Sequence, residues 1–254
     1  MRKIRVLLAG GESWVTFSTH HKGFDRFGAG MYDNGQRFLK DALRSDPSIE
    51  YTHMPGHEVS ERFPLTMEEL NEWDVIIISD IGSNSFLLSN KVFLEGKKEA
   101  NRLILLKEWT AHGGGLVMCG GYLSFSGFQA GAKYFRTPIE EVLPVDIYPF
   151  DDRVETPEGT EITIVDPKHP IVKDIKGPWP NFLGYQEAPL KSDAHLIARS
   201  QYGHPLIAIR KYGKGRSLVW MSDIGPHWCP LKFTQWEGYA TFWRNAVHYL
   251  AGDL

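Results

Sequence analysis

Cys119, His227 and Asp223 are the residues whose types suit nucleophilic chemistry. A histidine beside a cysteine can remove the thiol proton, and an acid can orient the imidazole. Cys119 precedes Gly120 and Gly121, whose backbone N–H groups on a sharp turn could lower the pKa of the thiol and stabilise an oxyanion. Alternatively, Cys119 is a small apolar residue that completes a core strand, and His227 contacts a ligand without transferring a proton.

A second set of residues suits ligand binding, because its members follow apolar, strand-like runs. These residues are Glu12, Trp14, His20, His21, Lys22, Asp80, Ser83, Asn84, Gly120, Gly121, Tyr122 and Trp228. In an open parallel sheet, ligands bind outside the carboxyl ends of the strands. We therefore predict that these segments converge in one crevice and bind a small polar metabolite, sugar-like in one interpretation. In that interpretation His21, Asp80, Asp223 and His227 act on the metabolite, and Cys119 is a bystander.

Common metal and nucleotide motifs are absent from the sequence. No HxH or HExxH spacing occurs, and the adjacent His20 and His21 would rarely point at the same ion. Neither GxGxxG nor GxxxxGK(S/T) is present, and two cysteines are too few for a disulfide framework. We expect no cofactor and no metal, with a metal-binding histidine loop as the alternative to a ligand-contacting one.

The first half of the chain alternates strand-like and helical patterns. Strands are expected over 4–9, 50–54, 75–78 and 116–119, and helices over about 34–44 and 97–112. Thr66 and Glu69 have the spacing of a capping box, which predicts a short helix between the second and third strands. This alternation predicts an α/β fold with a doubly wound, mostly parallel sheet.

The remaining segments are less regular. Residues 12–33 have no clean period, and we expect a long ligand-contacting loop there. Residues 137–190 are rich in proline and are expected to form loops and antiparallel strands inserted into a single domain of residues 1–254. Further strands are expected over 195–199, 206–210 and 217–221, and a final helix over 234–250 should pack on the sheet.

Composition limits the class of protein. The 254 residues include 28 Lys+Arg and 31 Asp+Glu, giving a net charge of −3, which argues against nucleic-acid binding. No apolar run approaches the ~20 residues needed to span a bilayer, and no signal-peptide pattern begins the sequence. We expect a cytoplasmic protein without nucleic-acid or membrane partners. A homo-oligomer is consistent with the symmetric assembly of many such proteins.

Six segments together resemble the glutamine amidotransferase-like family of bacterial cytoplasmic proteins, near the trehalose-utilisation (ThuA-like) proteins. The segments are ESW at 12–14, HKGFD at 21–25, GGGLVMCGGYLSF at 113–125, TPIEEVLP at 137–144, DPKHP at 166–170 and DIGPHW at 223–228. The resemblance covers nearly the whole chain. It implies a flavodoxin-like sheet with helices on both faces.

The resemblance also implies membership of the class I glutamine amidotransferase-like superfamily. Active members of that superfamily use a Cys-His-Glu triad, with the cysteine in a GxCxGx(Q/H) elbow and the histidine in a late HxE. With Cys119 aligned on the cysteine, Val117 replaces the first glycine and Leu123 the Gln or His. With His227 aligned on the histidine, Cys229 replaces the glutamate. The triad is incomplete, so three hypotheses stay open: a cysteine-dependent hydrolase or amidotransferase, a different enzyme on the same scaffold, and a non-catalytic ligand-sensing or interaction module.

Overall fold

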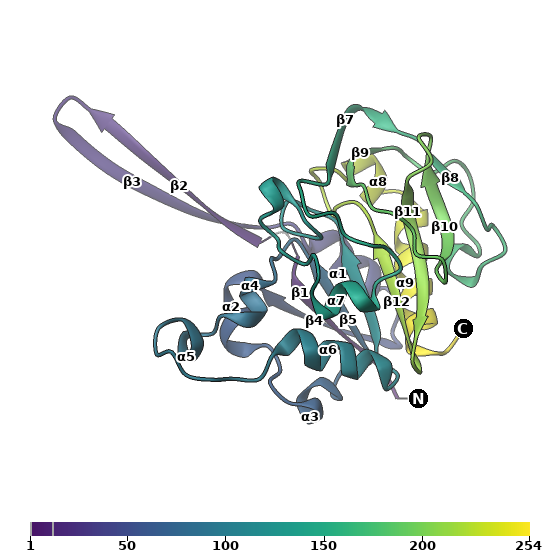
Figure 1. The fold of residues 1–254 in the computed structure, drawn as a ribbon. Coiled ribbons are helices and arrows are strands. Elements are labelled where there is room, and N and C mark those ends of the chain that lie inside the picture. The colour runs from purple at the N-terminus through teal and green to yellow at the C-terminus, as the bar shows by residue number, and fades with distance from the viewer. Residues whose placement is uncertain (1, 12) are drawn as a thin grey trace.

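The computed structural model describes residues 2–11 and 13–254 and places an eight-stranded sheet at the centre of the molecule (Figure 1). In spatial order its strands are β4 (Ile49–Pro55), β1 (Ile4–Gly10), β5 (Val75–Ser79), β6 (Gly115–Cys119), β12 (Gly215–Trp220), β11 (Pro205–Tyr212), β10 (His195–Ser200) and β8 (Ile162–Ile164). The first five strands are parallel, and the last three pair antiparallel with their neighbours. The predicted α/β fold with a mostly parallel sheet is confirmed.

Helices cover both faces of this sheet. They are α1 (Arg37–Arg44), α2 (Gly56–Arg62), α3 (Met67–Leu70), α4 (Asn84–Leu87), α5 (Asn90–Phe93), α6 (Arg102–Ala111), α7 (Pro138–Val142), α8 (Leu231–Thr234) and α9 (Glu237–Ala251). Helix α9 packs across β1, β5, β6 and β12 beside α1, while α6 packs beside α3, α4 and α7 on the opposite face (Figure 1). Thr66 and Glu69 form the predicted capping box at the start of α3. None of the described helices is long and apolar enough to cross a membrane.

The middle strands form the core because helices cover them on both sides. Every residue of β5 and β6 is buried, as the continuous apolar runs predict. On α9 the buried residues recur at three- and four-residue steps, including Tyr239, Trp243 and Leu250. These contacts fix the sheet strands as a rigid base for the segments that follow them.

The carboxyl ends of four parallel strands lie side by side. Gly10 of β1 pairs with Ser79 of β5, Ser79 with Cys119 of β6, and Cys119 with Trp220 of β12. The segments after these residues therefore leave the sheet from one edge, which we call the carboxyl edge. This is the edge at which the sequence predicted a site.

Residues 13–34 correct the prediction of a loop. They form a hairpin, the β arm, of β2 (Ser13–Lys22) and β3 (Asp25–Asn34), paired without interruption. The arm projects away from the body (Figure 1). Sequence periodicity failed here because neither face of the arm packs on the sheet, so apolar and polar residues do not segregate. The β-branched and aromatic residues of β2 were the signal for a strand.

The insertion over 137–190 contains the expected antiparallel strands. β7 (Arg153–Thr160) pairs with β9 (Phe182–Gln186) in a separate two-stranded sheet. The N–H of Gln186 donates to the carbonyl of Met221 (2.8 Å), and that of Leu183 donates to Trp228 (2.8 Å). These bonds attach the small sheet to the segment that follows β12, at the carboxyl edge.

Candidate functional site

Asp80 occupies a strained turn directly after β5. Its φ of +45° is in the left-handed region, which a non-glycine residue adopts at a cost of about 1–3 kcal/mol and which clusters at functional sites. Its N–H donates to Ser124 Oγ (3.0 Å), and its Oδ1 accepts the N–H of Leu123 (2.7 Å). The turn is therefore fixed by the loop that follows β6.

Gly121 allows this close approach. Its φ is +136°, and a Cβ at this position would lie 2.8 Å from both Cβ and Oδ1 of Asp80. The Gln186 side chain holds the same peptide group, because its Oε1 accepts the N–H of Gly121 (3.3 Å) and its Nε2 donates to the carbonyl (2.6 Å). Any larger residue at position 121 would displace Asp80.

Asp223 and His227 form a hydrogen-bonded pair after β12. Asp223 Oδ2 accepts from His227 Nδ1 (2.9 Å) and from the backbone N–H of Trp228 (2.9 Å). Asp223 is buried, whereas 47% of the His227 side chain is exposed. The bond to Asp223 raises the pKa of His227 above its usual value. Because Nδ1 is engaged, Nε2 is the ring nitrogen that can meet a ligand.

The charges of Asp223 and His227 also act on the carboxyl group of Asp80. Burial, reinforced by the charge of Asp223, raises the pKa of Asp80 to about 6, although the N–H of Leu123 and the charge of His227 oppose the shift. A carboxyl group and an imidazole whose pKa values are both perturbed, beside a buried carboxylate, mark a candidate for acid–base chemistry.

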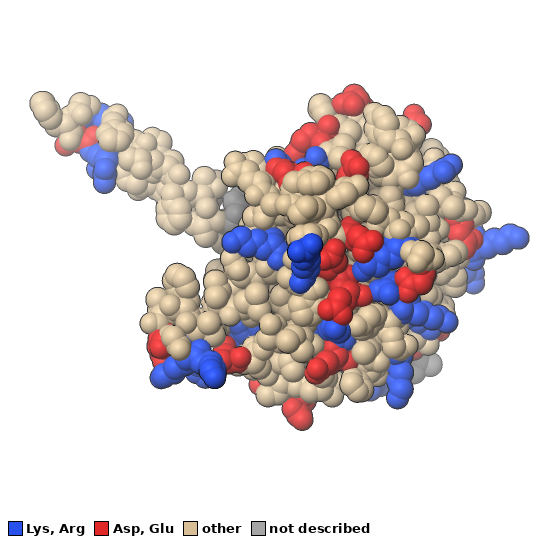
Figure 2. Space-filling view, in the orientation of Figure 1, with Lys and Arg blue, Asp and Glu red and all other residues tan. Residues whose placement is uncertain are grey.

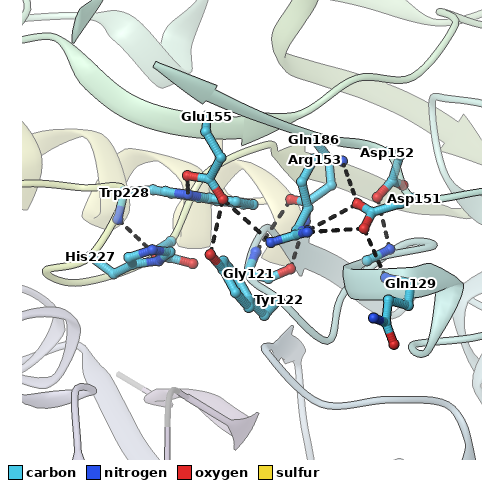
Figure 3. A network of polar contacts seen from close by, with 12 residues as sticks. Gly121, Tyr122, Gln129, Asp151, Asp152, Arg153, Glu155, Gln186, His227 and Trp228 are labelled. Carbon is cyan, nitrogen blue, oxygen red and sulfur yellow. Dashed lines mark hydrogen bonds and ion pairs between the residues drawn. The ribbon is translucent and has the colours of Figure 1, made fainter. Parts of the chain in front are cut away.

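Aromatic and charged residues surround His227 (Figure 3). The Tyr122 ring contacts the His227 ring edge to face, with centroids 5.0 Å apart. Glu155 accepts from the Tyr122 hydroxyl (3.0 Å) and from Trp228 Nε1 (2.8 Å). The Arg153 guanidinium lies 4.4 Å from the centre of the Tyr122 ring. The site therefore presents aromatic rings as well as carboxylate oxygens to a ligand.

Two neighbouring aspartates hold the loop after β6 in place. Asp152 is buried and accepts the N–H groups of Ser126 (2.9 Å) and Gly127 (2.8 Å), and burial raises its pKa to about 6. Asp151 accepts from Arg153 Nε and Nη2 (both 2.9 Å), which lowers the pKa of Asp151 to about 2. These aspartates position the loop that carries Tyr122.

Cys119 lies in the core rather than at the site surface. It is the last residue of β6, and its side chain has no exposed area. Cys229, which stands where the superfamily has its glutamate, is also fully buried. In this conformation a substrate cannot reach the Cys119 sulfur, as expected for a small apolar residue that completes a core strand.

Other residues predicted for ligand binding lie apart from His227. Ser83 is buried, and its Oγ donates to the Lys133 carbonyl (2.9 Å), whereas Asn84 is exposed at the start of α4. His20, His21 and Lys22 lie near the tip of the β arm, so the structure does not bring them to the carboxyl edge of the same chain. Glu12 and the side chain of Trp14 lie outside what the structure describes.

The candidate site reaches the surface through Tyr122, Glu155 and His227, which are exposed. Four hollows of about 340–480 Å³ lie elsewhere, and Asp80, Asp223 and His227 line none of them. Within residues 2–11 and 13–254, no group of three or more His, Cys, Asp or Glu side chains is arranged to hold a metal ion.

Sequence reasoning missed three residues of this site, Arg153, Glu155 and Gln186. All three come from the small β7–β9 sheet, which the sequence assigned only to an insertion. The cluster of charges over 151–155 was the available signal, but only the pairing of β9 beside the segment after β12 brings it to the carboxyl edge.

Solved structures with the same α/β fold match this chain over nearly its whole length. The cytoplasmic proteins STM3548 of Salmonella typhimurium and STM1381 of Salmonella typhimurium LT2 are 41% and 42% identical to this chain, with TM-scores of 0.92 and 0.91. Each match covers 97% of this chain and 99% of the other. A ThuA-like protein from Bacteroides uniformis ATCC 8492 (TM-score 0.59, 11% identity) covers 98% of this chain and 91% of its own, a likeness of fold alone.

The sequence itself identifies the family. Residues 5–252 match the family described as "Putative glutamine amidotransferase", and the chain belongs to that family. No protein with a curated function matches the sequence. The family resemblance expected from the six sequence segments is confirmed.

Proposed function

We propose that the carboxyl edge binds a small polar, sugar-like metabolite and that His227, oriented by Asp223, transfers a proton to or from it. The observation that carries this proposal is the 2.9 Å bond from His227 Nδ1 to the buried Asp223 carboxylate, with a half-exposed imidazole. A carboxylate that holds one ring nitrogen fixes the tautomer and orientation of the imidazole, so that the other nitrogen can act on a ligand.

Asp80 supplies the second acid–base group. General acid–base catalysis is most effective when the pKa of the group lies near the working pH. Burial and Asp223 raise the pKa of Asp80 to about 6, while its bond to Asp223 raises the pKa of His227. Near neutral pH a mostly ionised Asp80 therefore accepts a proton, and His227, whose protonated form the bond to Asp223 stabilises, donates one.

The ligand class is inferred from the residues around His227. Tyr122 and Phe128 stack with centroids 5.8 Å apart, and 38% and 43% of their surfaces are exposed. An aromatic face can pack on the C–H face of a sugar ring, while the Glu155 carboxylate and the Arg153 guanidinium match its hydroxyl groups. A ligand with both an apolar face and many hydroxyls fits this combination best.

Thiol attack and glutamine hydrolysis are not part of the proposal. Cys119 has no exposed area, and the buried Cys229 offers no carboxylate to orient His227 from the expected position. The non-catalytic alternative, a ligand-sensing module, would use the same residues without turnover. The two Salmonella relatives are named as cytoplasmic proteins, and we propose the same location for this chain.

The test uses a panel of monosaccharides, sugar acids and polyols, with thermal protection and chemical turnover as separate readouts. We expect a panel member to raise the Tm of the wild-type protein, and His227→Ala and Asp223→Asn to lose that protection. Cys119→Ala is the matched control and should keep it, because its side chain lies in the core. Loss of protection in Cys119→Ala but not in His227→Ala would overturn the proposal. Protection without turnover of any panel member would identify the ligand-sensing alternative.

A further inference from the structure

The β arm is a long two-stranded ribbon with little support from its own chain. Its ten-residue strands pair from Ser13–Asn34 to Lys22–Asp25, which gives a length of roughly 33 Å. The side chains of residues 15–33 are exposed, and near the base Tyr32 contacts His57 with ring centroids 5.5 Å apart. A hairpin isolated in water is marginally stable. A ribbon of this length therefore needs another surface to pack on.

The arm carries an unusual amount of exposed apolar surface. Phe17, Phe24 and Met31 are 82%, 109% and 65% exposed, and Phe27 and Tyr32 are about half exposed. At 150–250 Å² for each aromatic side chain, the apolar residues of the arm expose roughly 700 Å². Figure 2 shows charged side chains on the arm mainly near its tip. Apolar patches larger than a few hundred Å² mark interaction surfaces.

The glycines of β3 leave room for a second backbone. Gly28 and Gly30 pair with Thr19 and Phe17, so their positions share one face of the ribbon. Neither glycine has a positive φ, and a Cβ on Gly28 would meet no atom closer than 3.8 Å. The chain itself therefore does not require glycine at position 28. Glycine within a strand is typical where another backbone approaches closely.

The position of the arm favours a second copy of this chain as the occupant. The arm leaves the body just after β1, at the carboxyl edge, and points away from it (Figure 1). If a two-fold axis crosses the middle of the arm, the arms of two copies run antiparallel, and each tip reaches the carboxyl edge of the other copy. Phe17 and Tyr32 share the face of Gly28 and Gly30, whereas Phe27 and Met31 lie on the other face. Two arms packed through the glycine face therefore bury roughly 700 Å² of apolar surface, and the two tips docked at the carboxyl edges supply the rest of the area that a stable interface buries.

Charge complementarity agrees with this arrangement. The arm tip carries Lys22 and Arg26 beside two histidines, against the single carboxylate of Asp25. The candidate site exposes Asp151 and Glu155 and has more carboxylates than cations. Opposite charges at the two surfaces favour docking in this register. We infer that the β arm docks on a second copy across a two-fold axis and brings His20, His21 and Lys22 to the edge of the partner's open site.

Sedimentation velocity and light scattering of the full-length chain test the docking. We expect a dimer at tens of micromolar, and a monomer with wild-type far-UV circular dichroism for Phe17→Asp/Met31→Asp. Gly28→Leu should weaken the dimer at least tenfold without unfolding the monomer, because the monomer has space for that side chain. Phe93→Asp, at a 71% exposed position on α5, is the control and should remain dimeric. The inference would be overturned if the wild type were a monomer or assembled into a closed ring of more than two copies. A dimer that the arm variants leave intact would overturn it as well.

Photo-crosslinking tests where the tip lies. A benzophenone amino acid replaces Lys22, and copies with natural and heavy isotopes are mixed so that mass spectrometry separates inter-copy from intra-copy products. Inter-copy links to 80–84, 122–128 or 151–155 are expected, and links to other surfaces would refute the placement at the site. The docking of the β arm does not depend on the proposed function. Only the description of the carboxyl edge as a ligand site rests on it. If His227→Ala leaves metabolite protection intact while the arm still dimerises, the proposed function fails and the docking stands.

Discussion

Replacing Asp80 with asparagine should stabilise the protein at neutral pH. The amide side chain keeps an oxygen that can accept the N–H of Leu123, which in the wild type lies 2.7 Å from Oδ1, but it carries no charge. In the wild type, burial and the charge of Asp223 raise the pKa of Asp80 from its ordinary 3.8 to about 6. The folded protein therefore holds the Asp80 proton more tightly than the unfolded chain does.

The sign and magnitude follow from proton linkage. Between pH 3.8 and about 6 the folded state binds more protons than the unfolded state, so the contribution of Asp80 to stability falls as pH rises. The pKa of Asp80 differs by about two units between the folded and unfolded states. Above pH 7 this difference lowers the free energy of unfolding by about 3 kcal/mol. Asp80→Asn avoids this loss, so its free energy of unfolding should exceed that of the wild type by up to about 3 kcal/mol there. For a chain of this size that raises Tm by about 6–12 °C.

Urea unfolding of both proteins between pH 5 and pH 7.5 measures the effect. The advantage of Asp80→Asn should increase by about 1 kcal/mol across that interval, because Asp80 ionises within it. Asp151→Asn is the matched control with the opposite sign, since the Arg153 bonds lower the pKa of Asp151 to about 2 and its charge stabilises the fold. An Asp80→Asn variant less stable than the wild type at pH 7.5, or an advantage independent of pH, would refute the reasoning.

Three further predictions concern the same edge of the sheet. Asp223→Asn should lower the pKa of His227 towards its ordinary value, because the bond to Asp223 raises it; NMR titration of the imidazole tests this, and an unchanged pKa would contradict it. Iodoacetamide should not label Cys119 in the native protein at neutral pH, as peptide mass spectrometry can check, because the side chain has no exposed area. Gly121→Ala should cost at least about 1–3 kcal/mol of unfolding free energy, because it combines a φ of +136° with a Cβ 2.8 Å from Asp80; a wild-type urea midpoint would show that the turn can relax.

The sequence predicted the parts of the fold in which local pattern and burial agree. The continuous run at 75–78 specifies a strand covered on both faces, and the glycines that follow the strands at 4–9 and 116–119 mark where those strands end. The carboxyl edge followed from these strands, and with it Asp80, Asp223 and His227. The β arm did not follow, because a strand exposed on both faces has no period that separates it from a loop.

The remaining site residues depend on contacts between distant segments. Arg153 and Glu155 are 72 or more residues before His227, and only the attachment of β9 to the segment after β12 brings β7 to the imidazole. Gln186 shows the same limitation, since its bonds to Gly121 join residues 65 positions apart. No local pattern encodes such pairs. Cys119 shows the opposite case: the local pattern predicted a site residue, and the structure places the side chain in the core.

The parallel pairing of β6 with β12 has a consequence for how the chain folds during synthesis. Gly115 pairs with Arg216, so about a hundred residues must emerge before β6 acquires its second neighbour. Until then β6 presents an unsatisfied row of backbone groups, which is a template for intermolecular pairing. Long-range closure of this kind is slow. Asp223 and His227 follow β12 directly, so the acid–base pair is synthesised only after the strand that covers β6.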